Sequence, residues 1–454
     1  MFDVLTSILS KVDADYADIR YEIKKEVIIS FNGRELTQLS SNSTDGYVLR
    51  VLKNGGLSSV AFTNKKAVKK VIAWAEQNAL LISRNIDEPV TFAKSKTTVD
   101  CFLPELTEDP QQICIDEKLE LTRKYNNIPL KQSKIATTNI SYREIIRDKY
   151  FASTEGSKIR ESLTTTRING LIVSRDGTLI QNVRVGIGGS NGFAALRNQE
   201  EEFEKRTSIA RQLLNADSVK AGVYNAILNQ SLAGVFTHEA FGHFSEADLL
   251  ENNLSMRRKM KIGAKLGNDA LNIIDDPTIP NTLGFYKYDD EGTKAKPTQL
   301  MKNGVLTGRL HSRRTAAAFN EPLSGHCIAE DYRYAPIIRM GNIFIQSGNN
   351  SFDNLLSHLG NGLYVLDAKG GQTSGENFTF GAQYGYLVTN GRLGKIVRDI
   401  NIVGNLYKTL QHIYAIGDDV IMSKIGGCGK GQLNIRSCYG APHVLITDIV
   451  VGGT

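Results

Sequence analysis

The sequence predicts an α+β protein in two parts: an N-terminal α+β domain with an antiparallel sheet at residues 1–218, and a mostly antiparallel β domain at residues 219–454. Three observations support this fold class. A chain of 454 residues usually fills more than one domain core. Alternating apolar stretches recur between Asn-Gly and Asp-Gly pairs, which favour hairpin turns. A strongly charged helical stretch at residues 199–219 separates the two parts.

The N-terminal part combines a few helices with many strands. Asn32-Gly33, Asn54-Gly55-Gly56 and Asp176-Gly177 are expected hairpin turns, because these residues tolerate positive φ. The spacing of apolar residues predicts, in order, a helix at 2–12, strands across 17–62, helices at 64–88 and 110–126, and strands across 133–194.

The C-terminal part is expected to begin with a strand at 223–229 and one helix near 231–248. Many short strands should follow, with turns at Asn303-Gly304, Asn361-Gly362 and Asn390-Gly391. The boundary between the two parts is expected near residues 216–222. The expected helix near residues 231–248 carries the residues that are most informative about function.

The net charge and the cysteine content limit the classes of function that fit this sequence. The net charge of +6 is mild, and the densest basic run, Lys65 to Lys70, fits a solvated helix face better than a phosphate-binding patch. We therefore expect no nucleic-acid partner. The five cysteines are few and widely spread, which does not suggest a disulfide framework. With no signal peptide or membrane-spanning stretch in the sequence, we expect a cytoplasmic protein with reduced thiols.

One short segment brings together residue types that bind metals. Residues 238–243 read His-Glu-Ala-Phe-Gly-His, so two of the seven histidines lie within six residues. The common zinc-peptidase motif His-Glu-x-x-His places its histidines about 40° apart around a helix. Here the two histidines are five residues apart, which places them about 140° apart around an ideal helix. On a regular helix they could therefore not bind the same ion. A π-helical turn or a break would bring both to one ion, and Gly242 tolerates that distortion.

If both imidazoles bind one ion, the pattern indicates zinc-dependent hydrolysis. Zn²⁺ with three protein ligands keeps a fourth position for water, whose pKa it lowers towards about 7. Glu239 follows a ligand directly and can act as the general base. The residues themselves leave the third ligand open among Glu246, Asp248, Cys327, Cys428 and Cys438.

Several ordered segments resemble the TldD/PmbA metalloprotease family, on its TldD-like, metal-binding side. Such a set of segments is far more specific than the six-residue motif alone. The matching segments are His238 to His243 with Glu246 and Asp248; Asp289-Asp290-Glu291-Gly292, Asn303-Gly304-Val305-Leu306, His311 and Ala316; Glu330-Asp331-Tyr332-Arg333-Tyr334 with Pro336, Arg339 and Met340; Gly370-Gly371-Gln372, Phe380-Gly381-Ala382 and Asn390-Gly391; and Ile425 to Lys430.

The resemblance implies a zinc ion held by His238, His243 and Cys428, with Glu239 as the catalytic base. It also implies peptide or unfolded-protein substrates in extended form, which fits strand addition to a sheet edge. The protein would act as a homodimer or as a heterodimer with a TldE-like (PmbA) relative. The alternative function is a non-catalytic, peptide-binding partner subunit of such a dimer, which the intact motif disfavours.

Three further residues are candidates for substrate contact: Tyr332, Arg333 and Arg339. Arginine can bind a substrate carboxylate, and a tyrosine hydroxyl can stabilise an oxyanion. Strand-face salt bridges explain the two arginines equally well. The chain departs from the family pattern at residues 324–328, where His326 and Cys327 add two potential ligands. The roles of these two residues and of Cys438 stay open at this stage.

Overall fold

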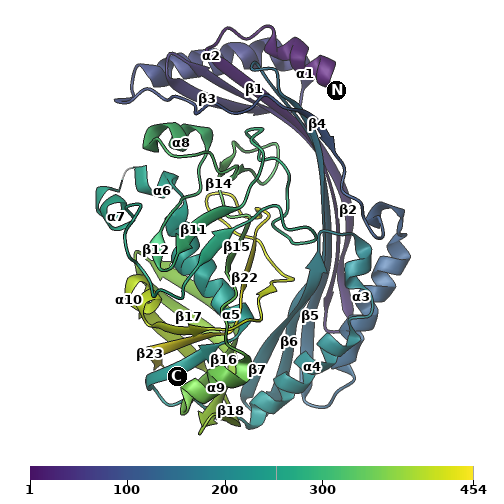
Figure 1. The fold of residues 1–454 in the computed structure, drawn as a ribbon. Helices are drawn as coiled ribbons and strands as arrows, with labels where there is room; N and C mark the ends of the chain where they lie inside the picture. Colours follow the sequence, from purple (N-terminus) through teal and green to yellow (C-terminus); the bar gives the residue numbers. More distant parts are fainter. Residues whose placement is uncertain (252, 453–454) are drawn as a thin grey trace.

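The N-terminal part of the computed structural model is one long, curved, mainly antiparallel sheet (Figure 1), and the structure describes residues 1–251 and 253–452. Along the sheet the order is β3-β2-β1-β5-β6-β4, with β7 also paired to β6. The expected turns are present: Gly33, Asn54 and Gly177 all have positive φ. The strands are β1 (Tyr16–Asn32), β2 (Glu35–Lys53), β3 (Gly56–Phe62), β4 (Val99–Phe102), β5 (Ile135–Ser153), β6 (Lys158–Asp176) and β7 (Leu179–Gly189).

Four helices cover the two ends of this sheet. They are α1 (Phe2–Leu9), α2 (Val68–Ser83), α3 (Ile115–Leu130) and α4 (Glu200–Gln212). Helix α2 buries its apolar stripe against one end, with Ala75 and Ala79 fully buried, and leaves Lys69 and Lys70 exposed. Helices α3 and α4 lie side by side at the other end, where Tyr125 stacks on Phe203.

The C-terminal part is built on a closed ring of strands. The order β16-β9-β23-β19-β17 closes through the pairing of β17 with β16, so these five strands leave no free edge among themselves. Strands β18, β8 and β20 extend the sheet. The members are β8 (Asp217–Ser218), β9 (Gly222–Leu228), β16 (Gly362–Ser374), β17 (Asn377–Thr389), β18 (Arg392–Arg398), β19 (Ile400–Asn405), β20 (Ile413–Ile416) and β23 (Val444–Gly452).

A second sheet and six short helices complete the C-terminal part. The sheet runs β12 (Val305–Leu306), β11 (Thr298–Lys302), β10 (Ile273–Asp275), β15 (Asn342–Ile345), β22 (Cys438–Ala441), β21 (Ile421–Met422), and a separate pair is β13 (Cys327–Ile328) with β14 (Ile337–Ile338). The helices are α5 (Gln230–Phe236), α6 (Asp248–Glu251), α7 (Leu254–Lys259), α8 (Arg313–Phe319), α9 (Phe352–Leu359) and α10 (Leu406–Gln411). The largely β character of this part agrees with the predicted fold class.

The long sheet curves around the C-terminal part (Figure 1), and buried ion pairs join the two. Lys149 of β5 lies 3.0 Å from Asp290, and Arg50 of β2 lies 2.8 Å from Glu291. Arg147 donates to the carbonyl of Ala329 across 3.0 Å. These contacts fix the position of one part against the other. The division of the chain at residues 218 and 219 stays a prediction.

Three local expectations differ from the structure. The helix expected over 110–126 begins only at Ile115, because a 3-10 turn at Pro110–Gln112 precedes it. The single helix expected over 231–248 changes its hydrogen-bonding pattern twice. Asn361-Gly362, expected as a turn among short strands, joins α9 to β16 after Gly360 ends the helix with positive φ. Across the described ranges, no helix is both long and apolar enough to cross a membrane.

Candidate metal centre and adjoining cavity

A helix with a widened turn carries the two motif histidines. Helix α5 starts at Asn229, whose side chain accepts a hydrogen bond from the Leu232 amide and caps the helix. The helix continues as a π-helix over Thr237–Gly242 and ends in a 3-10 turn over His243–Ser245. A π-helix brings residues five apart onto one side. The wider turn that the spacing required is therefore present.

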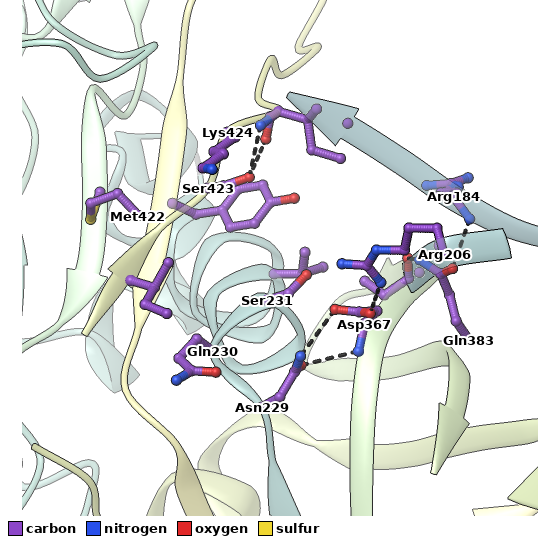
Figure 2. Close-up of a pocket in the computed structure, with 18 of the residues that line it drawn as sticks. Arg184, Arg206, Asn229, Gln230, Ser231, Asp367, Gln383, Met422, Ser423 and Lys424 are labelled. Carbon is purple, nitrogen blue, oxygen red and sulfur yellow. Dashed lines mark hydrogen bonds and ion pairs between the residues drawn. The ribbon is translucent and has the colours of Figure 1, made fainter. Parts of the chain in front are cut away.

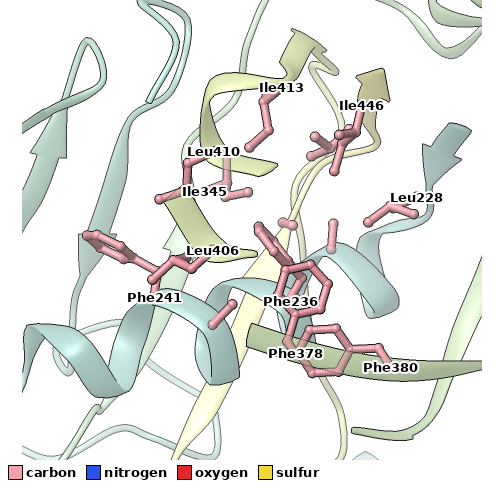
Figure 3. Close-up of a cluster of buried hydrophobic side chains, with 14 of the residues drawn as sticks. Leu228, Phe236, Phe241, Ile345, Phe378, Phe380, Leu406, Leu410, Ile413 and Ile446 are labelled. Carbon is pink, nitrogen blue, oxygen red and sulfur yellow. The ribbon is translucent and has the colours of Figure 1, made fainter. Parts of the chain in front are cut away.

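Packing around Gly242 holds this turn in place. A Cβ atom on Gly242 would lie 2.1 Å from the Met340 sulfur and 3.0 Å from Cδ1 of Ile343, so only glycine fits without rearrangement. On the apolar side of the helix, Phe236 and Phe241 are buried in the C-terminal core with residues such as Phe378 and Leu406 (Figure 3). The buried rings anchor the helix and direct the histidines to its other side.

His238, His243 and Cys428 converge. The His238 Nε2 atom lies 3.0 Å from the Cys428 Sγ atom, and the His243 Nε2 atom lies 3.6 Å from the same sulfur. The two imidazole planes are nearly perpendicular, at 87°. Cys428 comes from the loop between β21 and β22, where its backbone pairs with Ile435. Of the possible third ligands, Cys428 is thus the one that meets both imidazoles.

The donor set fits a tetrahedral metal ion. The three ligand atoms lie within 4.8 Å of one another. In a tetrahedral zinc site, the usual bond lengths place a sulfur and a nitrogen ligand about 3.6 Å apart. The Cys428–His243 separation already has this value, whereas the shorter His238 contact would lengthen when an ion is bound.

The pKa of the Cys428 thiol is shifted in the direction that favours metal binding. Burial raises the pKa of Cys428, but the charge of His238 and hydrogen bonds from both imidazoles outweigh burial and lower the pKa to about 6. Burial lowers the pKa of His243, but its hydrogen bonds with Cys428, Glu239 and Glu246 outweigh that effect and raise the pKa to about 11. The lowered pKa of Cys428 favours the thiolate, which is the form of cysteine that binds metals.

Behind His243 lies a buried charged network. The Glu246 carboxylate lies 3.4 Å from the His243 Nδ1 atom and accepts a hydrogen bond from Lys430 across 2.8 Å. Arg339 lies 3.2 Å from the other Glu246 oxygen, and its guanidinium nitrogens have no hydrogen-bond partner among the described residues. A carboxylate on the far nitrogen of a ligand histidine fixes the orientation of the ring.

Glu239 stands between the cluster and solvent. Its Oε2 atom lies 3.6 Å from the His243 Nε2 atom, and its side chain is 36% exposed. Partial burial raises the pKa of Glu239, but the hydrogen bond with His243 and the charge of His238 outweigh burial and lower it. The group is therefore a carboxylate near neutral pH, able to accept a proton.

Glu239 also lines a cavity of about 480 Å³ between the two parts of the chain (Figure 2). Arg184 of β7 and Arg206 of α4 contribute from the N-terminal part. Asn229, Asp367 and Gln383 contribute from the C-terminal part. The sequence analysis missed these lining residues, because they come from separate elements and no local motif marks them.

The three predicted substrate residues do not line this cavity, and their contact with substrate stays a prediction. Arg333 forms an ion pair with Asp331, and the Tyr332 ring packs close to Gly46 of β2; within the described chain, neither lines the cavity. For Arg333, the structure thus shows the salt bridge that the sequence left open. Arg339 lies beside Glu246, behind the cluster rather than in the cavity.

The additional histidine and cysteines are also accounted for. His326 is fully buried and lies 3.0 Å from Asp275. Cys438 donates to the Ser423 carbonyl, and burial raises the pKa of its thiol to about 12. Cys327 is buried as well, and burial raises its pKa. Among the described residues, neither thiol belongs to the cluster of His238, His243 and Cys428.

The fold and the cluster define a class: α+β proteins in which a His-Glu-x-x-x-His helix and a distant cysteine converge on a cluster that could hold a metal ion. Three domain models of the PmbA/TldA metallopeptidases match the chain: domain 1 at residues 17–79, the central domain at 108–216 and the C-terminal domain at 221–453. The chain belongs to this PmbA/TldD family of metallopeptidases.

Relatives and a solved structure agree with this assignment. The chain is 34% identical to a metalloprotease of Synechocystis sp., over 97% of this chain and 95% of the relative. It is 28% identical to the zinc metalloprotease TldD homolog of Saccharolobus solfataricus, over 98% of both chains. The fold matches the crystal structure of TldE from Thermococcus kodakarensis with a TM-score of 0.81 and 17% identity, over 100% of both chains.

Proposed function

We propose that this protein is a zinc-dependent peptidase that hydrolyses peptides or unfolded protein segments. The observation that carries the proposal is the convergence of His238, His243 and Cys428 beside Glu239, which opens into the cavity. Membership in a metallopeptidase family supports the reaction class. The name of the Saccharolobus solfataricus relative supports zinc as the metal.

In this mechanism, zinc bound by the three side chains would supply a Lewis acid and lower the pKa of water. The chain supplies the remaining steps. Glu239 accepts the proton of the attacking water on a carboxylate oxygen and delivers it to the leaving amine. Glu246 holds the His243 ring in the ligating orientation. Burial raises the pKa of Glu246, but its hydrogen bond with His243 and the charges of Arg339 and Lys430 outweigh burial and lower the pKa.

Replacing Glu239 tests the proposal. Glu239→Gln keeps the size of the side chain but removes the base, so zinc content should stay near one per chain while kcat falls by about 100-fold or more. Elemental mass spectrometry and hydrolysis of quenched fluorescent peptides measure the two quantities. Glu204→Gln, on the exposed side of α4, is the matched control and should change neither. Full activity in Glu239→Gln would contradict the role of Glu239.

We also propose a cytoplasmic dimer, formed either by two copies or with a TldE-like relative. The five free cysteines support a reducing compartment, and the fold likeness to TldE supports a related partner. Sedimentation analysis of the zinc-loaded protein tests the copy number, and a monomer at micromolar concentration would exclude the homodimer. If zinc binds but no peptide is hydrolysed, a non-catalytic peptide-binding subunit becomes the better function.

A further inference from the structure

The cavity beside Glu239 carries three positive charges that have no anionic partner. Arg184 of β7, Lys205 of α4 and Lys424 of the loop before Cys428 all line it and are exposed. Within the described residues, none of their charged groups forms an ion pair. Figure 2 shows Arg184 and Lys424 on opposite sides of the cavity, so a bound chain would pass between them.

Two acidic side chains of the cavity wall share one arginine. Asp367 pairs with Arg206 and accepts a hydrogen bond from Asn229 across 3.0 Å (Figure 2). Arg206 also donates to Glu202 across 2.7 Å. Asp367 is 6% exposed and is held at a φ of 58°, which is unusual for a residue other than glycine and marks a tightly determined position.

The remaining carboxylate of the lining, Glu239, faces His243 and the cluster. The lining holds four basic side chains, Arg184, Lys205, Arg206 and Lys424, and three acidic ones, Glu202, Glu239 and Asp367, so its net charge is positive. Exposed cations without ion pairs attract ligands of the opposite sign and raise their local concentration.

We propose that this cavity selects peptides that carry a carboxylate close to the scissile bond. The carboxylate is either an acidic side chain or the C-terminal α-carboxylate, since both present the same group to Arg184, Lys205 and Lys424. The inference rests on the proposed peptidase function and adds a substrate class to it. Partly exposed ion pairs each change an equilibrium by about 2- to 5-fold, so we expect an acidic preference of about 5- to 20-fold.

Matched peptides test the preference on the full-length, zinc-loaded protein. One quenched fluorescent peptide is made with Glu, Gln or Lys at each position flanking the cleavage site, and each version carries a free or an amidated C-terminus. We expect kcat/KM to follow Glu above Gln above Lys, mainly through KM. A loss of the preference on amidation would assign the carboxylate to the C-terminus, and its persistence would assign it to the side chain. The preference should shrink as the salt concentration rises.

Reversing the charge of single residues in the cavity tests whether the preference for acidic peptides arises there. Arg184→Glu and Lys424→Glu should abolish or invert the ratio of acidic to neutral peptide cleavage, while zinc content stays unchanged. The matched control is Lys302→Glu on β11, which reverses an equally exposed charge outside the cavity and should leave the ratio as in the parent. An unchanged ratio in both cavity variants would overturn the proposal.

The peptidase function and the carboxylate preference predict different failures. If neutral and acidic peptides are cleaved with equal kcat/KM, the peptidase function stands and the carboxylate preference is wrong. If no peptide is cleaved, the peptidase function is wrong. The preference is then decided by fluorescence anisotropy of the same peptides on the Glu239→Gln protein, where equal affinity for the Glu and Lys versions would overturn it.

Discussion

In the proposed zinc site, metal retention depends most on Cys428, because its sulfur meets both imidazoles. Cys428→Ala should weaken zinc binding by about 100-fold or more, since even the loss of a hydrogen-bond partner behind a ligand costs about 10- to 100-fold. Cys438→Ala removes a buried, protonated thiol and should leave zinc affinity unchanged. Competition with a chromophoric chelator measures both variants. The reverse order would make Cys438 the ligand.

The roles of residues could be predicted only where those residues lie close together along the chain. His238, Glu239 and His243 stand out because they fall within six residues. No physical rule about residue spacing could select Cys428, because it lies 190 positions from His238 along the chain. Only the fold brings the two side chains together. For the same reason the sequence does not indicate the residues that line the cavity. The role of Arg333, which pairs with its neighbour Asp331, stays a prediction.

At the scale of the helix, Gly242 links packing to metal binding. Gly242→Ala forces a methyl group onto the buried Met340 sulfur, so the free energy of unfolding should fall by about 1–3 kcal/mol. Zinc affinity should fall with it, because the π-turn sets the separation of the histidines. Thermal and denaturant unfolding, together with zinc titration, measure the two effects.

The double variant Gly242→Ala/Met340→Ala provides the control. Met340→Ala removes the obstructing sulfur, so Gly242→Ala should cost less in its presence, with a coupling energy of about 1 kcal/mol or more. Strict additivity would show that the two residues do not compete for space.

Element types were largely predictable, while transitions within an element were not. Alternation and Asn-Gly turns defined the N-terminal hairpins, because a strand with one buried face has a period of two. The helix near residue 231 was expected as one unit, yet its pattern changes at Thr237 and His243. These changes depend on packing against Met340 and Ile343, which belong to another segment. The helix propensity of residues 231–248 alone gives no information about that packing.

At the scale of the whole molecule, acid should weaken the junction between the two parts. Burial raises the pKa of Asp331, but hydrogen bonds from Arg333 and the charge of Lys24 outweigh burial and lower the pKa to about 2. Burial likewise raises the pKa of Asp290, and Arg20 and Lys149 outweigh it and hold the pKa well below its usual range. An unfolded aspartate titrates near 3.9. The stabilisation is therefore complete above about pH 5 and is lost as pH falls through about 4 towards 2.

Each of these carboxylates should contribute about 1–2 kcal/mol at neutral pH. The midpoint of thermal unfolding, followed between about pH 6 and pH 2.5, should drop steeply in the parent and less steeply in Asp331→Asn. Asp3→Asn, on the exposed start of α1, should keep the parent slope. Equal slopes in the parent and in Asp331→Asn would exclude this carboxylate as a source of acid sensitivity.

The order of the segments along the chain has a consequence for biosynthesis. The histidine helix emerges from the ribosome long before Cys428, which follows His238 by 190 residues. Strand β23, which pairs with both β9 and β19 in the closed ring, is made later still. A nascent chain therefore displays an incomplete ligand set and an open ring of strands for most of its synthesis. The proposed ligand set, and the cavity wall that includes Tyr439, are therefore complete only in the last stage of translation.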